Sequence, residues 1–163
     1  MVIKKTDSKP IEKGIGFGVT SGIITTIGMI VGLDSVTHSA KAVIGGIIAI
    51  AIADAFSDAL GMHVSEETQR QSRLKNIWIA TLSTFLSKFI FASMFIVLFL
   101  IFEVNAAVNV SIAWGLFVLI VYNYRLAKQE NKDPFKIISE HVLIAIVVIV
   151  ATHYVGHIVE LLK

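Results

Sequence analysis

The stretch that decides the fold is AIAIADAFSDALGMHVSEE, residues 49–67, an apolar helical segment that carries two aspartates, Asp54 and Asp58. Residues four apart lie on one face of an α-helix, about 6 Å apart along its axis, so the two carboxylates are predicted to be neighbours. If this helix spans a bilayer, each ionisable side chain costs on the order of 3 kcal/mol. Intramembrane carboxylates are rare and mark ion or proton pathways, so the function is expected to lie on this helix.

The composition predicts an integral membrane protein. Of the 163 residues, 55% are hydrophobic and 16% are charged, with a mean hydropathy of +0.79, which is too apolar for a soluble domain. The absence of cysteine excludes disulfides, thiolate metal sites and a nucleophilic thiol. The pattern contains no catalytic triad, nucleotide-binding loop or nucleic-acid-binding motif, so neither an enzymatic activity nor a resident cofactor is expected.

Five apolar segments are each long enough to cross a bilayer as a helix, which needs about 20 residues. The first is basic on its N-terminal side but lacks a small-residue cleavage site, so it is interpreted as a retained helix rather than a secretory signal. The prediction is an all-α polytopic protein with a single transmembrane domain over residues 1–163 and helices at about 14–33, 41–63, 77–102, 108–126 and 136–162.

The basic residues predict the orientation of these helices. Eleven lysines and arginines fall at the N-terminus and in the connections after the second and fourth helices, whereas the opposite side has only Lys41 and Lys163. Under the positive-inside rule this bias places the N-terminus in the cytoplasm and the C-terminus outside. A lipid bilayer is therefore expected to surround the chain.

Two interpretations of Asp54 and Asp58 follow from the residues alone. Paired carboxylates near hydroxyls, such as that of Ser57 and those of the first helix, suit a hard or borderline divalent cation. Alternatively, one aspartate forms a structural ion pair with Lys88, near the middle of the third helix, which needs a partner of its own. Lys88 fits both interpretations, because its ammonium can replace a bound ion when the site is empty.

Two further groups of polar residues lie near helix ends. His63, Glu66 and Glu67 fall at the predicted cytoplasmic end of the second helix, where they could meet a metal ion or serve only as solvated charges. His153, His157 and Glu160 could share one face of the last helix as a metal or proton site, or rest at the membrane interface without a function.

Two stretches carry a resemblance to a known family. GFGVTSGIITTIGMIVGL at 16–33 resembles the first helix of the vacuolar iron transporter family, and SDALGMHVSEETQRQ at 57–71 resembles the end of its second helix. The resemblance implies five transmembrane helices, a homodimer with an ion path near its two-fold axis, and movement of Fe²⁺ or Mn²⁺ out of the cytosol in exchange for protons. A chain this short suggests a small prokaryotic member in the cell membrane, without the cytosolic metal-binding domain of larger members.

The departures from the family pattern concern the site itself. Ser21 stands where the family has its first-helix aspartate, and Asp58 stands where it has a methionine; Met62 and His63 replace a glutamate and a tyrosine. Exchanging a thioether for a carboxylate shifts the preference toward harder ions. The resulting hypothesis is a divalent-metal transporter. The residues expected to hold the metal are Asp54, Asp58, Ser21, Ser57, Met62, His63 and Glu66, with Lys88 as counter-charge.

The alternative function is a non-transporting membrane subunit or interaction protein, in which an Asp58–Lys88 pair only holds the helices together. Burial of a paired lysine is compatible with both functions, because an unpaired charge within a bilayer is costly in either.

Overall fold

The chain folds into five long helices. The computed structural model describes residues 5–69 and 73–162, and within these ranges it contains helices and no strand. The helices are α1 (Lys5–Thr37), α2 (Ala40–Glu67), α3 (Leu74–Ile101), α4 (Val104–Gln129) and α5 (Pro134–Glu160). All five are long and apolar enough to cross a membrane, so the predictions of an all-α fold and of five candidate spans are confirmed.

The helices are longer than most of the predicted apolar segments, because a helix continues past its apolar part until its backbone is capped. The Ser39 hydroxyl accepts a hydrogen bond from the Ala42 amide at 3.4 Å and starts α2. The Asp133 carboxylate accepts one from the Phe135 amide at 3.0 Å, and Pro134 occupies the first turn of α5. Hydropathy alone therefore located the spans but not their ends.

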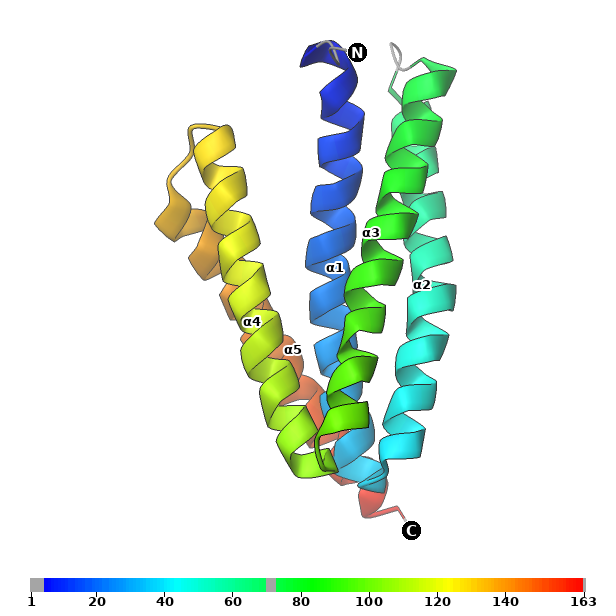
Figure 1. The fold of residues 1–163 in the computed structure, drawn as a ribbon, viewed down its shortest axis with the longest axis vertical. Coiled ribbons are helices and arrows are strands. Elements are labelled where there is room, and N and C mark those ends of the chain that lie inside the picture. The colour runs from blue at the N-terminus through cyan, green and yellow to red at the C-terminus, as the bar shows by residue number, and fades with distance from the viewer. Residues whose placement is uncertain (1–4, 70–72, 163) are drawn as a thin grey trace.

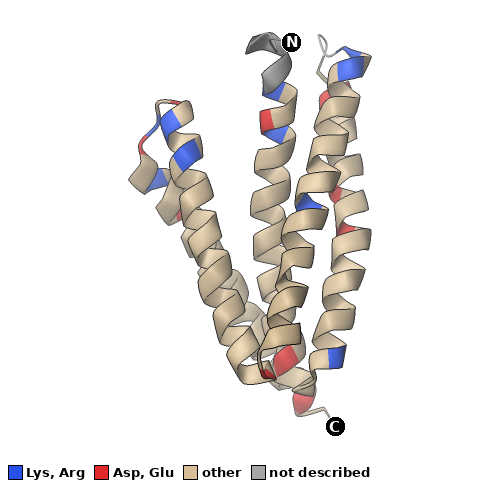
Figure 2. Ribbon diagram, in the orientation of Figure 1, with Lys and Arg blue, Asp and Glu red and all other residues tan. Residues whose placement is uncertain are grey.

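The connections divide between two ends of the bundle. The N-terminus, the α2–α3 connection and the α4–α5 connection lie at one end, here called the N-terminal end, and the remaining connections and the C-terminus lie at the other, the C-terminal end (Figure 1). Most basic residues mark the N-terminal end (Figure 2). Lys41 is in the first turn of α2, which begins at the C-terminal end. Lys4, Arg70 and Lys163, which entered the charge count, lie outside the described residues, as does the side chain of Lys5.

Helix α1 is the centre of the bundle and uses glycines on both of its halves. Toward the N-terminal end it packs on α3, where a Cβ atom on Gly18 would lie 2.0 Å from Ser87 Oγ and 2.6 Å from the Thr84 carbonyl oxygen. Toward the C-terminal end it packs on α5, where a Cβ atom on Gly28 would lie 2.5 Å from Val148. The glycine-rich first helix therefore gives close backbone approach on two sides, as small residues do in membrane bundles.

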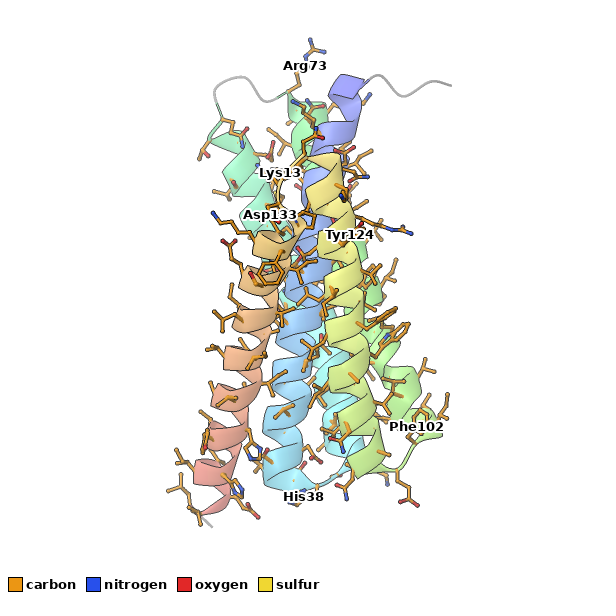
Figure 3. The ribbon with its side chains drawn as sticks, turned by 90° about the vertical axis from the view of Figure 1, so that its left-hand side faces the viewer. Lys13, His38, Arg73, Phe102, Tyr124 and Asp133 are labelled. Carbon is orange, nitrogen blue, oxygen red and sulfur yellow. The ribbon has the colours of Figure 1, made fainter. Side chains whose placement is uncertain are left out.

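The α4–α5 pair diverges from the other three helices toward the N-terminal end, so the ribbon has the outline of a V (Figure 1). A cavity of about 860 Å³ lies in this opening, with Lys13 and Phe17 of α1 among its lining residues, and Glu130 and His141 from the α4–α5 side. Seen from the side, Lys13, Arg73 and Asp133 lie toward the N-terminal end and His38 lies at the C-terminal end (Figure 3).

Candidate ion-binding site

Lys88 on α3 is the centre of a polar cluster inside the bundle. Its side chain is 1% exposed and is the largest fully buried side chain in the part of the chain that the structure describes. It can lie there because α1 presents Gly22 to it: a Cβ atom on Gly22 would be 3.3 Å from Lys88 Cα. Close packing of α1 on α3 thus places an ammonium group between α1 and α2.

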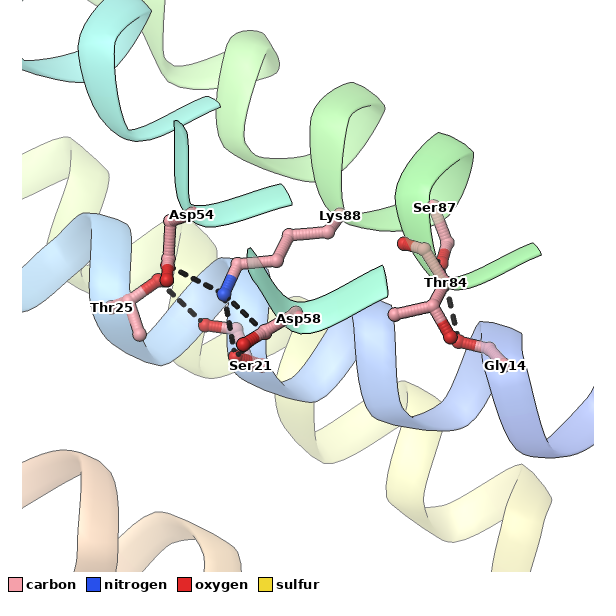
Figure 4. A network of polar contacts seen from close by, with 8 residues as sticks. All are labelled: Gly14, Ser21, Thr25, Asp54, Asp58, Thr84, Ser87 and Lys88. Carbon is pink, nitrogen blue, oxygen red and sulfur yellow. Dashed lines mark hydrogen bonds and ion pairs between the residues drawn. The ribbon is translucent and has the colours of Figure 1, made fainter. Parts of the chain in front are cut away.

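Three side chains surround that ammonium group (Figure 4). Lys88 Nζ donates hydrogen bonds to Ser21 Oγ at 2.8 Å and to Asp58 Oδ2. Asp54 Oδ2 lies 2.5 Å from the same nitrogen as an ion pair. The structure therefore brings together Asp54, Asp58, Ser21 and Lys88, which were all selected from the sequence.

The two aspartates are not held equally. Asp58 Oδ2 also accepts a hydrogen bond from Ser21 Oγ at 2.7 Å, so this oxygen is held from both α1 and α3. Asp54 Oδ2 accepts no hydrogen bond from any described residue, although it lies within ion-pair distance of Nζ. Asp58 is the anchored carboxylate, and Asp54 is the one with unused hydrogen-bonding capacity.

The cluster contains one carboxylate more than its single cation requires. No other Lys, Arg or His in the described ranges forms an ion pair with Asp54 or Asp58. If both carboxylates are ionised, the cluster carries one net negative charge about halfway along three candidate spans. An uncompensated charge within a bilayer is expensive, so the arrangement favours uptake of one further positive charge.

The cluster is accessible from one side. The side chains of Asp54 and Asp58 are 29% and 20% exposed, on the flank of α2 that no other helix covers. That flank continues along α2 as a row of small, exposed residues at four-residue spacing: Gly45, Ala49, Ala53, Ser57 and Gly61. Ser57 thus lies on the open flank, and it is absent from the hydrogen bonds around Lys88.

The remaining predicted site residues lie further toward the N-terminal end. Met62 is buried one turn after Asp58. His63 Nδ1 contacts Thr81 Oγ1 at 3.0 Å, and its ring packs on Trp78. Glu66, about 12 Å along the helix from Asp58, is buried and pairs with Lys13 of α1. These residues form a second polar layer, apart from the aspartates.

The sequence analysis missed one juxtaposition. Asp34, Ser35 and His38 at the end of α1 share a cavity of about 470 Å³ with His153 and His157 of α5. A pattern in one sequence gives no signal for this proximity, because it depends on how α5 packs against α1. Among the side chains of residues 9–69 and 73–162, no three His, Asp or Glu stand close enough to hold a metal ion together.

Comparison of the chain with protein-family models, with curated proteins and with solved structures finds no match. The resemblance to vacuolar iron transporters consequently stays an expectation carried by two stretches of sequence, and the functional argument must come from the site.

Proposed function

We propose that the chain is a membrane transporter that moves a divalent metal cation, of the Fe²⁺ or Mn²⁺ kind, out of the cytosol in exchange for protons. The observation that carries the proposal is the surplus carboxylate around Lys88. A purely structural pair needs one aspartate, whereas a site that alternates between its own ammonium group and an external cation needs two.

The proposed cycle uses the contacts of the cluster. A divalent cation reaching Asp54 and Asp58 would neutralise both carboxylates and displace the Lys88 ammonium, with the Ser21 hydroxyl oxygen as a further ligand. After release, Lys88 would pair with one carboxylate again and a proton would neutralise the other, which couples the cation to protons. Asp54 is the natural first ligand, because its side chain is the more exposed of the two and is held by one ion pair, whereas Asp58 is held by two hydrogen bonds.

The second polar layer supports a route to the cluster. Glu66, His63 and Glu67 lie between the aspartates and the N-terminal end, where the basic residues favour a cytoplasmic location. The Lys13–Glu66 pair ties α1 to α2 on this route. We propose that it opens when a cation passes.

We propose that the working form is a homodimer in a prokaryotic cell membrane, with the open flank of α2 facing its copy. Asp54 and Asp58 would otherwise lie partly exposed to hydrocarbon, where charged groups are expensive. The small residues from Gly45 to Gly61 along that flank would allow two α2 helices to approach closely. The ion path would then lie between the two copies.

The test is cation flux into proteoliposomes with an imposed pH gradient, measured for Fe²⁺, Mn²⁺ and Mg²⁺. Wild-type protein should move Fe²⁺ or Mn²⁺ only with an opposing proton gradient, and Asp54→Asn should abolish that flux. Asp133→Asn is the matched control, since it makes the same chemical change at a helix N-cap that asparagine satisfies equally well. Normal flux in Asp54→Asn would refute the proposal.

One observation favours the alternative function, a non-transporting membrane subunit. Asp58 is fixed by Lys88 and Ser21 in the way a structural strut would be. A subunit of this kind predicts no flux of any ion from well-folded protein, together with unfolding of Asp58→Ala in detergent. A transporter instead predicts that Asp54→Asn is folded but inactive.

A further inference from the structure

We propose that His153 and His157 form a second cation site, a two-imidazole chelate for a divalent transition-metal ion at the C-terminal end of α5. The two residues are four apart on one helix, a spacing that presents two ring nitrogens to one ion. The site is separate from the Lys88 cluster. Its role as a point where the transported ion is received rests on the proposed function, but the binding itself does not.

The spacing of the two rings fits one ion. A metal ion bound at 2.0–2.1 Å from an imidazole nitrogen lies about 3.2 Å from the ring centroid, so two imidazoles around a tetrahedral ion have centroids about 5 Å apart. The centroids of His153 and His157 are 5.2 Å apart, and the rings are inclined at 71°. The pair is therefore at chelating distance without a movement of the helix.

The hydrogen bonds around the rings leave the outer nitrogens free. Ser35 Oγ donates its single proton to the Val31 carbonyl oxygen at 2.8 Å, so at its 3.0 Å contact with His153 Nδ1 the ring nitrogen is assigned as the donor. His157 Nδ1 lies 3.3 Å from Glu160 Oε2, an acceptor. In the neutral His153 ring Nε2 then carries the lone pair that a metal requires, with Nδ1–H held by the Ser35 oxygen as in known histidine sites, and the carboxylate beside His157 Nδ1 favours the same tautomer there.

The surroundings favour a positive charge. The cavity of about 470 Å³ beside the pair is also lined by Asp34 of α1, whose Oδ1 atom is buried and accepts no hydrogen bond from a described residue. His38 Nδ1 is 3.9 Å from this oxygen, beyond hydrogen-bond distance. The α4 residues that line the cavity, such as Asn109, are not ionisable. With only two protein ligands at hand, water completes the coordination of the ion.

Access to the site is open. Both His153 and His157 are exposed, and His157 lies within one turn of the end of α5. Borderline ions with an affinity for imidazole, such as Ni²⁺, Cu²⁺ and Zn²⁺, suit this site, whereas Mg²⁺ and Ca²⁺ prefer oxygen ligands and suit it poorly.

The test is calorimetric titration of untagged, detergent-solubilised protein with Ni²⁺, since a polyhistidine tag would itself bind the probe. His153→Asn and His157→Gln should each weaken Ni²⁺ binding at least about tenfold. His141→Gln is the matched control: His141 is on the same helix, has no histidine four residues away and should leave binding unchanged.

Cu²⁺ electron paramagnetic resonance gives a second readout that does not depend on affinity. One equivalent of Cu²⁺ should show coupling to two imidazole nitrogens in wild-type protein and to fewer in His157→Gln. Unchanged Ni²⁺ affinity in both histidine variants, or a Cu²⁺ signal without two nitrogens, would overturn the proposal. The Lys88 cluster is intact in every variant, so absence of ion flux in liposomes would refute the transport function and leave this result standing.

Discussion

The two polar clusters that touch α1 differ in how far their charges are satisfied within the chain. The Lys88 cluster is internal, and its ammonium group is 1% exposed between two carboxylates. The histidine pair at the end of α5 is exposed, and the contacts of its rings with protein oxygens are made by the Nδ1 atoms. Under the two proposals, the Lys88 cluster releases an internal partner before it binds a cation, whereas the histidine pair binds one without such a release. Substitutions in the two clusters test this difference.

Replacing Lys88 should have the largest effect. Lys88→Met keeps the length of the side chain but leaves two carboxylates without their counter-charge, which for a buried pair costs about 3–5 kcal/mol. Thermal unfolding in metal-free detergent should show this loss, and added Mn²⁺ should restore most of it by taking the place of the ammonium group. Loss of stability without recovery in Mn²⁺ would identify the cluster as structural only.

Substitution of the two aspartates should affect stability and transport differently. Asp58→Asn gives up charged hydrogen bonds to Ser21 and Lys88, each worth about 1.5–3 kcal/mol, so its unfolding temperature should fall. Asp54→Asn removes the surplus negative charge and should leave the unfolding temperature unchanged or raised while it abolishes ion flux. Equal losses of stability in the two variants would contradict the assigned asymmetry.

The packing that places Lys88 can be tested at Gly18. Gly18→Ala forces a Cβ atom against Ser87 Oγ and the Thr84 carbonyl oxygen, and overpacking of this kind costs about 1–3 kcal/mol. Gly32→Ala is the matched control on the same helix, because the nearest atom to its added Cβ, Thr152 Cβ, lies at 3.5 Å, an ordinary van der Waals distance, and alanine favours a helix by up to about 1 kcal/mol. If both variants unfold at the same temperature, close approach of α1 and α3 does not position the cluster.

The histidine pair should contribute least to stability. His157 is exposed, and its ion pair with Glu160 and its ring contact with His153 both lie within α5, so His157→Gln should change the free energy of unfolding by less than about 0.5 kcal/mol. Chemical denaturation of the wild type and the variant would measure this difference. A larger loss would mean that the pair holds the end of α5 in place, like the Lys88 cluster in the middle of the bundle.

Much of the fold followed from hydropathy, because an apolar run of about 20 residues has few structures open to it in a bilayer. Pairing of one aspartate with Lys88 was among the expectations, since a lysine in the middle of a span needs a carboxylate, and the structure places both aspartates beside it. The sequence did not show that Ser57 lies on the open flank of α2. Helical spacing predicts which residues share a face of a helix. Which face is covered depends on the neighbouring helices.

The histidine pair shows the same limit. Its spacing along α5 was evident from the sequence, and its location beside Asp34 and Ser35 was not, because that contact joins residues more than a hundred positions apart. It arises where Gly156 allows close approach of the two helices: a Cβ atom there would lie 2.5 Å from Ser35 Cβ. The spacing of residues in the sequence predicts which ligands share one helix. The residues of other helices that lie beside them depend on how the helices pack.

The most direct test of the central claim is equilibrium binding of Mn²⁺, followed by the paramagnetic resonance signal of the free ion, to wild-type protein and to Asp54→Asn. Asp54→Asn keeps the Asp58–Lys88 pair, so it should remain folded, and Asp133→Asn provides the control. We predict that wild type and Asp133→Asn bind Mn²⁺ alike and release protons as they do so, and that Asp54→Asn does not bind it. Equal binding by Asp54→Asn, or no binding by folded wild-type protein, would contradict the account.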